Sequence, residues 1–174
     1  MLIDIIDHLD KVGKRQPSFI IMVEHLLQCS DPFIVETGTM RQEDNYEGDG
    51  MSTLLWHNVI KMMKKGSYIS IDNDLAAVEF ARIKVGCEGW YPSIIHSDSV
   101  KHLFRMTQNW WPDRKIDLLY LDSWDMEFPD RVPSFLHTMF EFMTIKPFLA
   151  KNALIVVDDN IKVLKDNEPE ERMV

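Results

Sequence analysis

Five short apolar runs in this chain each end in, or are soon followed by, acidic residues. These residues are Glu36, Asp72, Asp98, Asp122, and Asp158 with Asp159. Carboxylates accept hydrogen bonds from hydroxyl and amino groups, and their oxygens are ligands for hard cations. Because the carboxyl ends of parallel strands meet at one edge of a sheet, where α/β proteins bind ligands, we expect one acidic rim that forms a binding site.

The first of these runs leads into a glycine turn. Residues 33–39 read Phe-Ile-Val-Glu-Thr-Gly-Thr, and Gly50-Met51-Ser52-Thr53 opens a helical pattern further on. The Gly-Lys-Ser/Thr sequence of a P-loop is absent, and Gly38 is not followed by the further glycines of a dinucleotide fingerprint. Glu36 would also stand close to a pyrophosphate. The turn therefore favours a cationic or neutral ligand over a polyanionic one.

Helices and strands alternate along the chain. The strands are expected at 33–35, 67–72, 93–96, 115–122 and 153–157, and helices at 3–12, about 18–27 and 50–65. Further helices follow Asp74, Ser97 or Asp98, and Asp130, which can cap them, and Gly66 and Gly86 are helix stops. This alternation predicts an α/β, Rossmann-like, doubly wound and mainly parallel sheet of order 3-2-1-4-5, with helices on both faces.

Length and composition narrow the class of protein. The 174 residues predict one domain, with leading helices at 1–30, a core at 31–162 and a polar tail at 163–174. No apolar run approaches the ~20 residues that cross a bilayer, and the acids at the N-terminus argue against a signal peptide, so we expect a cytoplasmic protein without a membrane partner. A net charge of −9 disfavours nucleic acid. Cys29 and Cys87 suggest neither a disulfide framework nor a zinc site.

Residues 30–162 resemble the class I S-adenosylmethionine-dependent methyltransferases. In that family the turn after the first strand, here Glu36-Thr37-Gly38, receives the methionine part of the cofactor. An acid that ends the second strand, here Asp72, binds the ribose hydroxyls, and an acid after the third, here Asp98, binds the adenine amino group. The resemblance implies S-adenosyl-L-methionine as cofactor. The implied cofactor-binding residues are Glu36, Gly38, Thr39, Ser52, Asp72, Asn73, Asp98, Ser99 and Asp122.

Within the family the glycine loop looks most like that of catechol-type small-molecule O-methyltransferases, Glu-x-Gly-Thr followed by Gly-Tyr-Ser-Thr. Here an apparent insertion of about eight residues, 41–48, separates the two halves of the loop; it is acidic and carries one aromatic residue. The insertion is either a lid or cofactor-side loop, or a solvated surface excursion.

The same resemblance implies a possible magnesium site. Its ligands would be Asp122, Asp159 and Asn160, which match metal-binding positions of the subgroup. Asp125 stands where the subgroup has a basic lysine. No catalytic base is therefore identified, and Asp122 and Asp125 are only candidates.

Two further features are ambiguous. His96 is expected to be bonded locally rather than to act as a base, and Trp110-Trp111-Pro112 to pack at the far edge of the sheet. The antiparallel strand pair that usually ends the family's fold is expected to be absent or truncated. An uncovered fifth strand would then be an exposed edge, which favours a homodimer.

The sequence therefore predicts methyl transfer to a small acceptor that bears a hydroxyl group. Two alternatives stay open. One is a non-catalytic, cofactor-binding module of a complex, which the absent lysine favours, and the other is a nucleotide-sugar or dinucleotide enzyme on a similar sheet.

Overall fold

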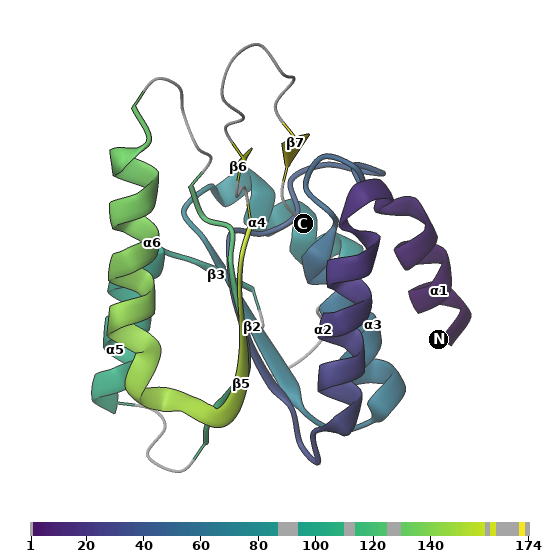
Figure 1. Cartoon of the computed structure of the whole chain (residues 1–174), viewed down its shortest axis with the longest axis horizontal. Helices are drawn as coiled ribbons and strands as arrows, with labels where there is room; N and C mark the ends of the chain where they lie inside the picture. Colours follow the sequence, from purple (N-terminus) through teal and green to yellow (C-terminus); the bar gives the residue numbers. More distant parts are fainter. Residues whose placement is uncertain are drawn as a thin grey trace.

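The computed structural model describes residues 2–86, 94–109, 114–124, 130–158, 161–162 and 171–172. Its centre is a parallel five-stranded sheet of order β3-β2-β1-β4-β5 (Figure 1). The strands are β1 Phe33–Thr37, β2 Ser67–Asp72, β3 Ile94–His96, β4 Ile116–Leu121 and β5 Leu149–Val157. The predicted α/β class, parallel direction and strand order are confirmed.

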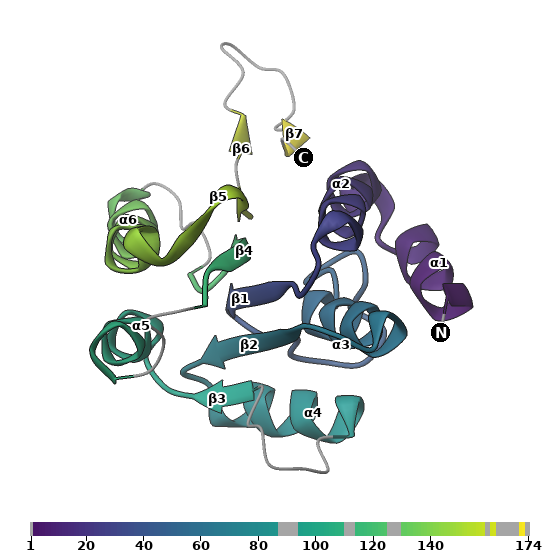
Figure 2. The ribbon, with the colours of Figure 1, turned by 90° about the horizontal axis from the view of Figure 1, so that it is seen from below.

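Helices cover both faces of the sheet (Figure 2). One face carries α5 and α6, and the other carries α2, α3 and α4, while α1 packs outside α2 and α3. The helices are α1 Leu2–Lys11, α2 Gln16–Gln28, α3 Ser52–Met63, α4 Leu75–Val85, α5 Ser99–Asn109 and α6 Val132–Ile145. Two 3-10 turns, Gly13–Arg15 and Lys146–Phe148, precede α2 and β5.

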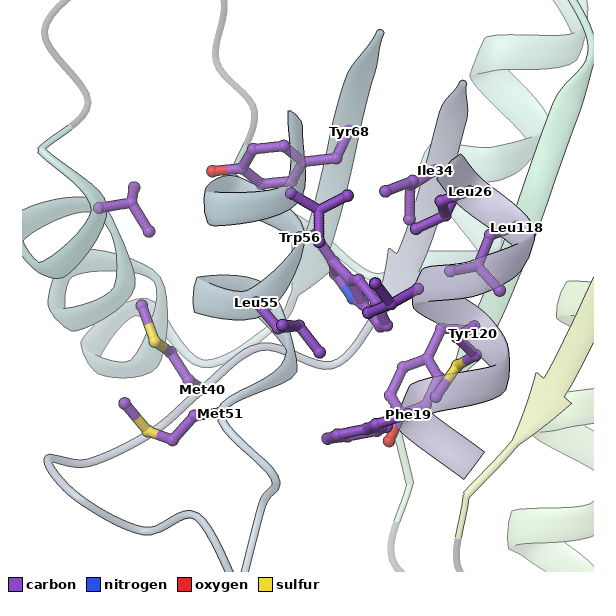
Figure 3. Close-up of a cluster of buried hydrophobic side chains, with 14 of the residues drawn as sticks. Phe19, Leu26, Ile34, Met40, Met51, Leu55, Trp56, Tyr68, Leu118 and Tyr120 are labelled. Carbon is purple, nitrogen blue, oxygen red and sulfur yellow. The ribbon is translucent and has the colours of Figure 1, made fainter. Parts of the chain in front are cut away.

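The larger core lies between the sheet and helices α2 and α3 (Figure 3). Phe19, Trp56 and Tyr120 meet there edge to face, with ring centroids 5.9–6.2 Å apart. A second, smaller core on the other face includes Leu103, Leu119 and Ile145. Strands β1, β2 and β4 are thus buried on both faces, as their nearly continuous apolar sequences predict.

The predicted caps of α4 and α6 act as expected, but α3 ends at Met63, with Lys64 rather than Gly66 as its left-handed C-cap. The Asp74 side chain accepts from the Ala76 N–H at 2.8 Å and caps α4, which ends at Gly86 with φ 64°. Asp130 accepts from the Val132 N–H at 3.1 Å, at the start of α6. Gly66, with φ 89°, turns the chain after α3 so closely that an added Cβ would lie 2.6 Å from the Pro32 carbonyl oxygen.

The orientation of α6 differs from that of an ordinary amphipathic helix. Its apolar stripe of Val132, Phe135, Leu136, Met139, Phe140 and Met143 is exposed. The buried face consists of Ser134, Glu141 and Ile145. Ser134 Oγ donates to the Trp124 carbonyl at 3.0 Å and Ser123 Oγ donates to Glu141 at 2.7 Å, so hydrogen bonds to the chain after β4 hold the polar face inward.

The end of the sheet also differs from expectation in one respect. β5 begins at Leu149, four residues before the predicted start, and its pairing with β4 shifts register between Ile116 and Leu118. In the described part of the chain β5 is an edge strand, and β6 Ile161–Lys162 and β7 Glu171–Arg172 form a separate antiparallel pair.

Among these described residues no helix is long and apolar enough to span a membrane.

Candidate functional site

Five of the predicted cofactor residues surround one cavity at the carboxyl ends of β1, β2 and β3. Its walls are Gly38, Ile71, Asp72, Asn73, Asp98, Ser99, Ser123, Trp124 and His137. The cavity measures about 20 Å³, which is room for roughly one water molecule. The topology therefore brings these five predicted residues together, in a closed arrangement.

Gly38 allows β1 to turn directly beside the end of β4. Its φ is 83°, and an added Cβ would lie 2.1 Å from the carbonyl oxygen of Asp122. The Gly38 N–H donates to the Ile71 carbonyl at 2.8 Å, and the Gly38 carbonyl accepts from Ser70 Oγ at 3.2 Å. Only glycine satisfies both the positive φ and the close approach at this position.

The Asp72 carboxylate is fixed by two backbone donors. Thr39 N–H donates to its Oδ2 at 2.9 Å, and Asp74 N–H donates to its Oδ1 at 2.8 Å. The residue is 8% exposed and lines the cavity. Each carboxylate oxygen has a second lone pair, so Asp72 can still accept from a ligand hydroxyl.

Asp98 and Ser99 bring the start of α5 to the same cavity. Asp98 Oδ1 accepts from the Lys101 N–H at 2.8 Å, which places the carboxylate at the helix N-terminus. Ser99 Oγ lies 2.9 Å from His137 Nε2. Both residues line the cavity together with Asp72 and Asn73.

Glu36 lies in a different environment from the one expected for a residue that touches a cofactor. It is fully buried and accepts from Ser52 Oγ at 2.5 Å, Thr53 Oγ1 at 2.7 Å and Trp56 Nε1 at 2.9 Å. Burial raises the pKa of its carboxyl to about 7, against these donors, which lower it. Neither Glu36 nor Ser52 lines the cavity, so this geometry gives them the role of attaching α3 to β1.

Thr39 connects this attachment to the cavity. Its Oγ1 lies 2.9 Å from Thr53 Oγ1, while its N–H binds Asp72. A chain of hydrogen bonds therefore runs from buried Glu36 through Thr53 and Thr39 to the Asp72 carboxylate. Such a chain holds the turn after β1 in one conformation.

A second, larger cavity of about 380 Å³ adjoins the first at Ser123 and Trp124. It lies between the ends of β4 and β5 and the start of α6. Its other lining residues are Leu121, Asp122, Arg131, Val132, Ser134, Phe135, Thr138, Val157 and Asp158. The volume suits a small molecule, and the walls combine apolar side chains with a few polar groups.

The predicted metal site falls only partly within the described residues. Asp122 lines the larger cavity, whereas Asp125, Asp159 and Asn160 lie outside the part of the chain that the structure describes. Within that part, no three His, Cys, Asp or Glu side chains form a group suited to a metal. Asp158 Oδ2 accepts from the Tyr120 hydroxyl at 2.9 Å and lies 3.1 Å from an Arg15 nitrogen.

The pair formed by His137 and Glu141 is absent from the sequence-based site. Nε2 of His137 lies 3.2 Å from Oε1 of Glu141, which raises the pKa of the imidazole. The Trp124 ring packs against His137 with centroids 5.3 Å apart. The spacing of four residues, on a helix with no other ionisable residue, is the signal that could have identified this pair.

The 41–48 insertion is anchored to the N-terminal helices. Arg15 donates to the carbonyls of Glu47 and Gly48 at 2.9 and 2.5 Å, and Tyr46 packs edge to face on His8 at 5.0 Å. His8 also binds the Gly50 carbonyl at 2.9 Å. These contacts show that at least part of the insertion packs against the protein rather than standing free in solvent.

The remaining sequence-based residues are placed as follows. His96 Nε2 lies 3.0 Å from the Asn73 carbonyl, as the expected local bond requires. Cys29 is a free thiol, while Cys87 and Trp110 to Pro112 lie outside the described residues.

Comparisons of this chain with family models, curated proteins and solved structures give no match.

Proposed function

We propose that this protein binds S-adenosyl-L-methionine and transfers its methyl group to a small acceptor with a hydroxyl group. The observation that supports this proposal best is the small cavity at the ends of β1, β2 and β3. Gly38, Asp72, Asn73, Asp98 and Ser99 line it together, although they come from three separate segments of the chain.

These hydrogen-bond acceptors fit the chemistry of the cofactor. Asp72 can accept from the ribose hydroxyls, and Asp98 can accept from the adenine amino group. The acidic rim also suits a sulfonium cation, and the bound cofactor supplies an electrophilic methyl group. The volume of the small cavity limits cofactor binding, because about 20 Å³ cannot hold an adenine ring. Binding therefore requires the Trp124 side chain, which is 47% exposed, to move away from His137.

The larger cavity is the proposed acceptor site. It shares Ser123 and Trp124 with the smaller cavity, and Phe135 and Val157 give it apolar walls for an aliphatic or aromatic body. Asp122 lines this cavity, and in this proposal it accepts a hydrogen bond from the acceptor hydroxyl. Catalysis would rest mainly on holding the acceptor oxygen in line with the methyl group, which is a positioning effect.

Isothermal titration calorimetry with S-adenosylhomocysteine tests the cofactor site. We expect saturable binding to the wild type and at least tenfold weaker binding to Asp98→Asn, whose amide oxygen can still cap α5. Glu79→Gln, on the exposed side of α4, is the matched control and should bind like the wild type. Absence of binding to the folded wild type would refute the proposal.

Turnover separates an enzyme from a binding module. Incubation with tritiated S-adenosylmethionine and a panel of phenols and aliphatic alcohols, with and without Mg²⁺, should label an acceptor. Cofactor binding without label transfer to any of them would favour the non-catalytic module instead.

A further inference from the structure

The outward face of α6 and the adjacent β5 edge form an apolar surface that nothing in the described chain covers. Figure 2 shows α6 and β5 at one end of the molecule, with no other helix outside α6. We refer to this surface as the α6 face. Its eight members are Val132, Phe135, Leu136, Met139, Phe140, Met143, Ile155 and Val157, which are 38% to 62% exposed.

The two strand residues belong to the same surface as the helix. Leu154 and Val156 pack into the core beneath α2, so the alternation of β5 turns Ile155 and Val157 to the side of the sheet that carries α6. Val157 also lines the larger cavity together with Val132 and Phe135. The apolar surface is therefore continuous from the helix to the strand.

Its area is that of an interface. At these exposed fractions, with roughly 200 Å² for a fully exposed phenylalanine, the eight side chains present on the order of 700 Å². The largest apolar patch of a typical monomer covers about 300–600 Å². A standard protein interface buries about 800 Å² on each partner. The α6 face thus offers nearly the area that one subunit of a stable dimer contributes.

The outward side of α6 also carries no charge. The ionisable residues within the helix are His137 and Glu141, and both turn inward, with side chains 17% and 0% exposed. A surface without charge meets an identical surface without electrostatic penalty. The surface also lacks the charges that a strongly charged partner would recognise.

The spacing of the six helix residues is symmetrical, with steps of three, one, three, one and three residues. When two such helices pack antiparallel across a twofold axis, the pattern superimposes on itself. Phe135 then faces Phe140 of the partner subunit, and Leu136 faces Met139 of the partner subunit. An isologous dimer interface requires this self-complementarity.

We propose that the α6 face is the interface of a homodimer in which the α6 helices of two copies pack antiparallel. The packing follows the shallow crossing angle that is common for helices whose contact residues repeat three and four apart. Because Val132 and Phe135 line the larger cavity, the partner subunit would form part of its outer wall. The dimer itself does not depend on the proposed methyl transfer.

Sedimentation velocity over a range of protein concentrations tests the dimer. We expect the wild type to sediment as a discrete species of twice the mass of one chain, and Phe140→Glu and Phe135→Lys each to sediment as a monomer. Ile83→Glu is the matched control: Ile83 is 82% exposed on α4, across the sheet from α6, and its replacement should leave the dimer intact. Circular dichroism verifies that each variant is folded.

Mixing the two monomeric variants tests the antiparallel arrangement. In the mixed pair the glutamate introduced by Phe140→Glu faces the lysine introduced by Phe135→Lys in the other chain, and the two remaining phenylalanines face each other. The dimer should therefore return only on mixing. A wild type that stays monomeric, or that forms open-ended aggregates, would overturn the proposal. A dimer that survives Phe140→Glu, or variants that fail to pair on mixing, would overturn the assigned interface.

Discussion

The indole N–H of Trp56 donates to Oε1 of Glu36 across 2.9 Å, inside a core from which both side chains are excluded from solvent. The same carboxylate accepts from Ser52 and Thr53, so one buried acid fixes the first turn of α3 to the centre of the sheet. Because burial raises the pKa of this carboxyl, its ionisation makes the stability of the fold depend on pH.

Glu36→Gln should remove a part of the pH dependence of stability. The pKa of this carboxyl is 4.5 without burial and about 7 in the folded protein. Between these values the unfolded chain loses the proton and the folded chain keeps it, so stability falls as pH rises through this window. The expected loss is about 3 kcal/mol. Urea unfolding at pH 4 and pH 8 measures it.

Other groups also titrate between pH 4 and pH 8. The test is therefore the difference between the pH profiles of stability of the wild type and the variants. Relative to Glu36→Gln, the wild type should lose stability from pH 4 to pH 8, whereas Glu79→Gln should follow the wild type. Parallel pH profiles for the wild type and Glu36→Gln would show that Glu36 ionises equally in both states.

Gly38→Ala should destabilise the fold strongly, because φ is 83° and the new Cβ would lie 2.1 Å from the Asp122 carbonyl oxygen. We expect a loss of about 3 kcal/mol or more from overpacking and backbone strain combined. Gly86→Ala is the matched control: its φ is 64° with nothing within 4 Å of the Cβ, so about 1 kcal/mol should be lost. Equal losses of unfolding free energy for Gly38→Ala and Gly86→Ala, measured by chemical denaturation, would contradict the close packing of Gly38 against Asp122.

Trp124 should report cofactor binding by fluorescence. Because Trp124 lines the small cavity and its ring packs on His137, S-adenosylhomocysteine should change its emission when the ring moves. In Trp124→Phe most of this change should disappear, although calorimetry should still detect binding. An emission change of the same size in this variant would assign the movement to another tryptophan.

Arg15→Ala should loosen the 41–48 insertion. The change removes the hydrogen bonds to the carbonyls of Glu47 and Gly48 and the ion pair with Asp158. Limited proteolysis with a glutamate-specific protease under native conditions should therefore cut faster within the insertion. Lys14→Ala, at an exposed neighbouring position, should be cut at the wild-type rate. Equal rates for Arg15→Ala and the wild type would mean that other contacts hold the loop.

The sheet was predictable because its strands are short apolar runs with clear breaks between them. Asp74 and Gly86 act locally at the two ends of α4, so sequence alone identifies them. The orientation of α6 was not predictable in this way. Periodicity shows which residues share a face of a helix, but burial of Glu141 depends on Ser123, which lies in another segment.

Sequence alone likewise identifies some residues of the candidate site and misses others. Asp72 and Asp98 end or follow parallel strands, and topology alone brings them to one edge. Glu36 lies one residue before the end of β1, and strand alternation turns its side chain under α3 rather than toward the cavity. His137 lines the small cavity from α6, and Arg15 pairs with Asp158 from the 3-10 turn before α2; only tertiary packing reveals these two contacts.

A crystal structure of the 174-residue chain, from crystals grown with S-adenosylhomocysteine, would test the central claim most directly. The account predicts the adenosine between Asp72 and Asp98, with the Trp124 ring displaced from His137 and the sulfur atom directed toward the larger cavity. Ligand density elsewhere on the molecule, or a cavity that stays closed at saturating ligand, would contradict it.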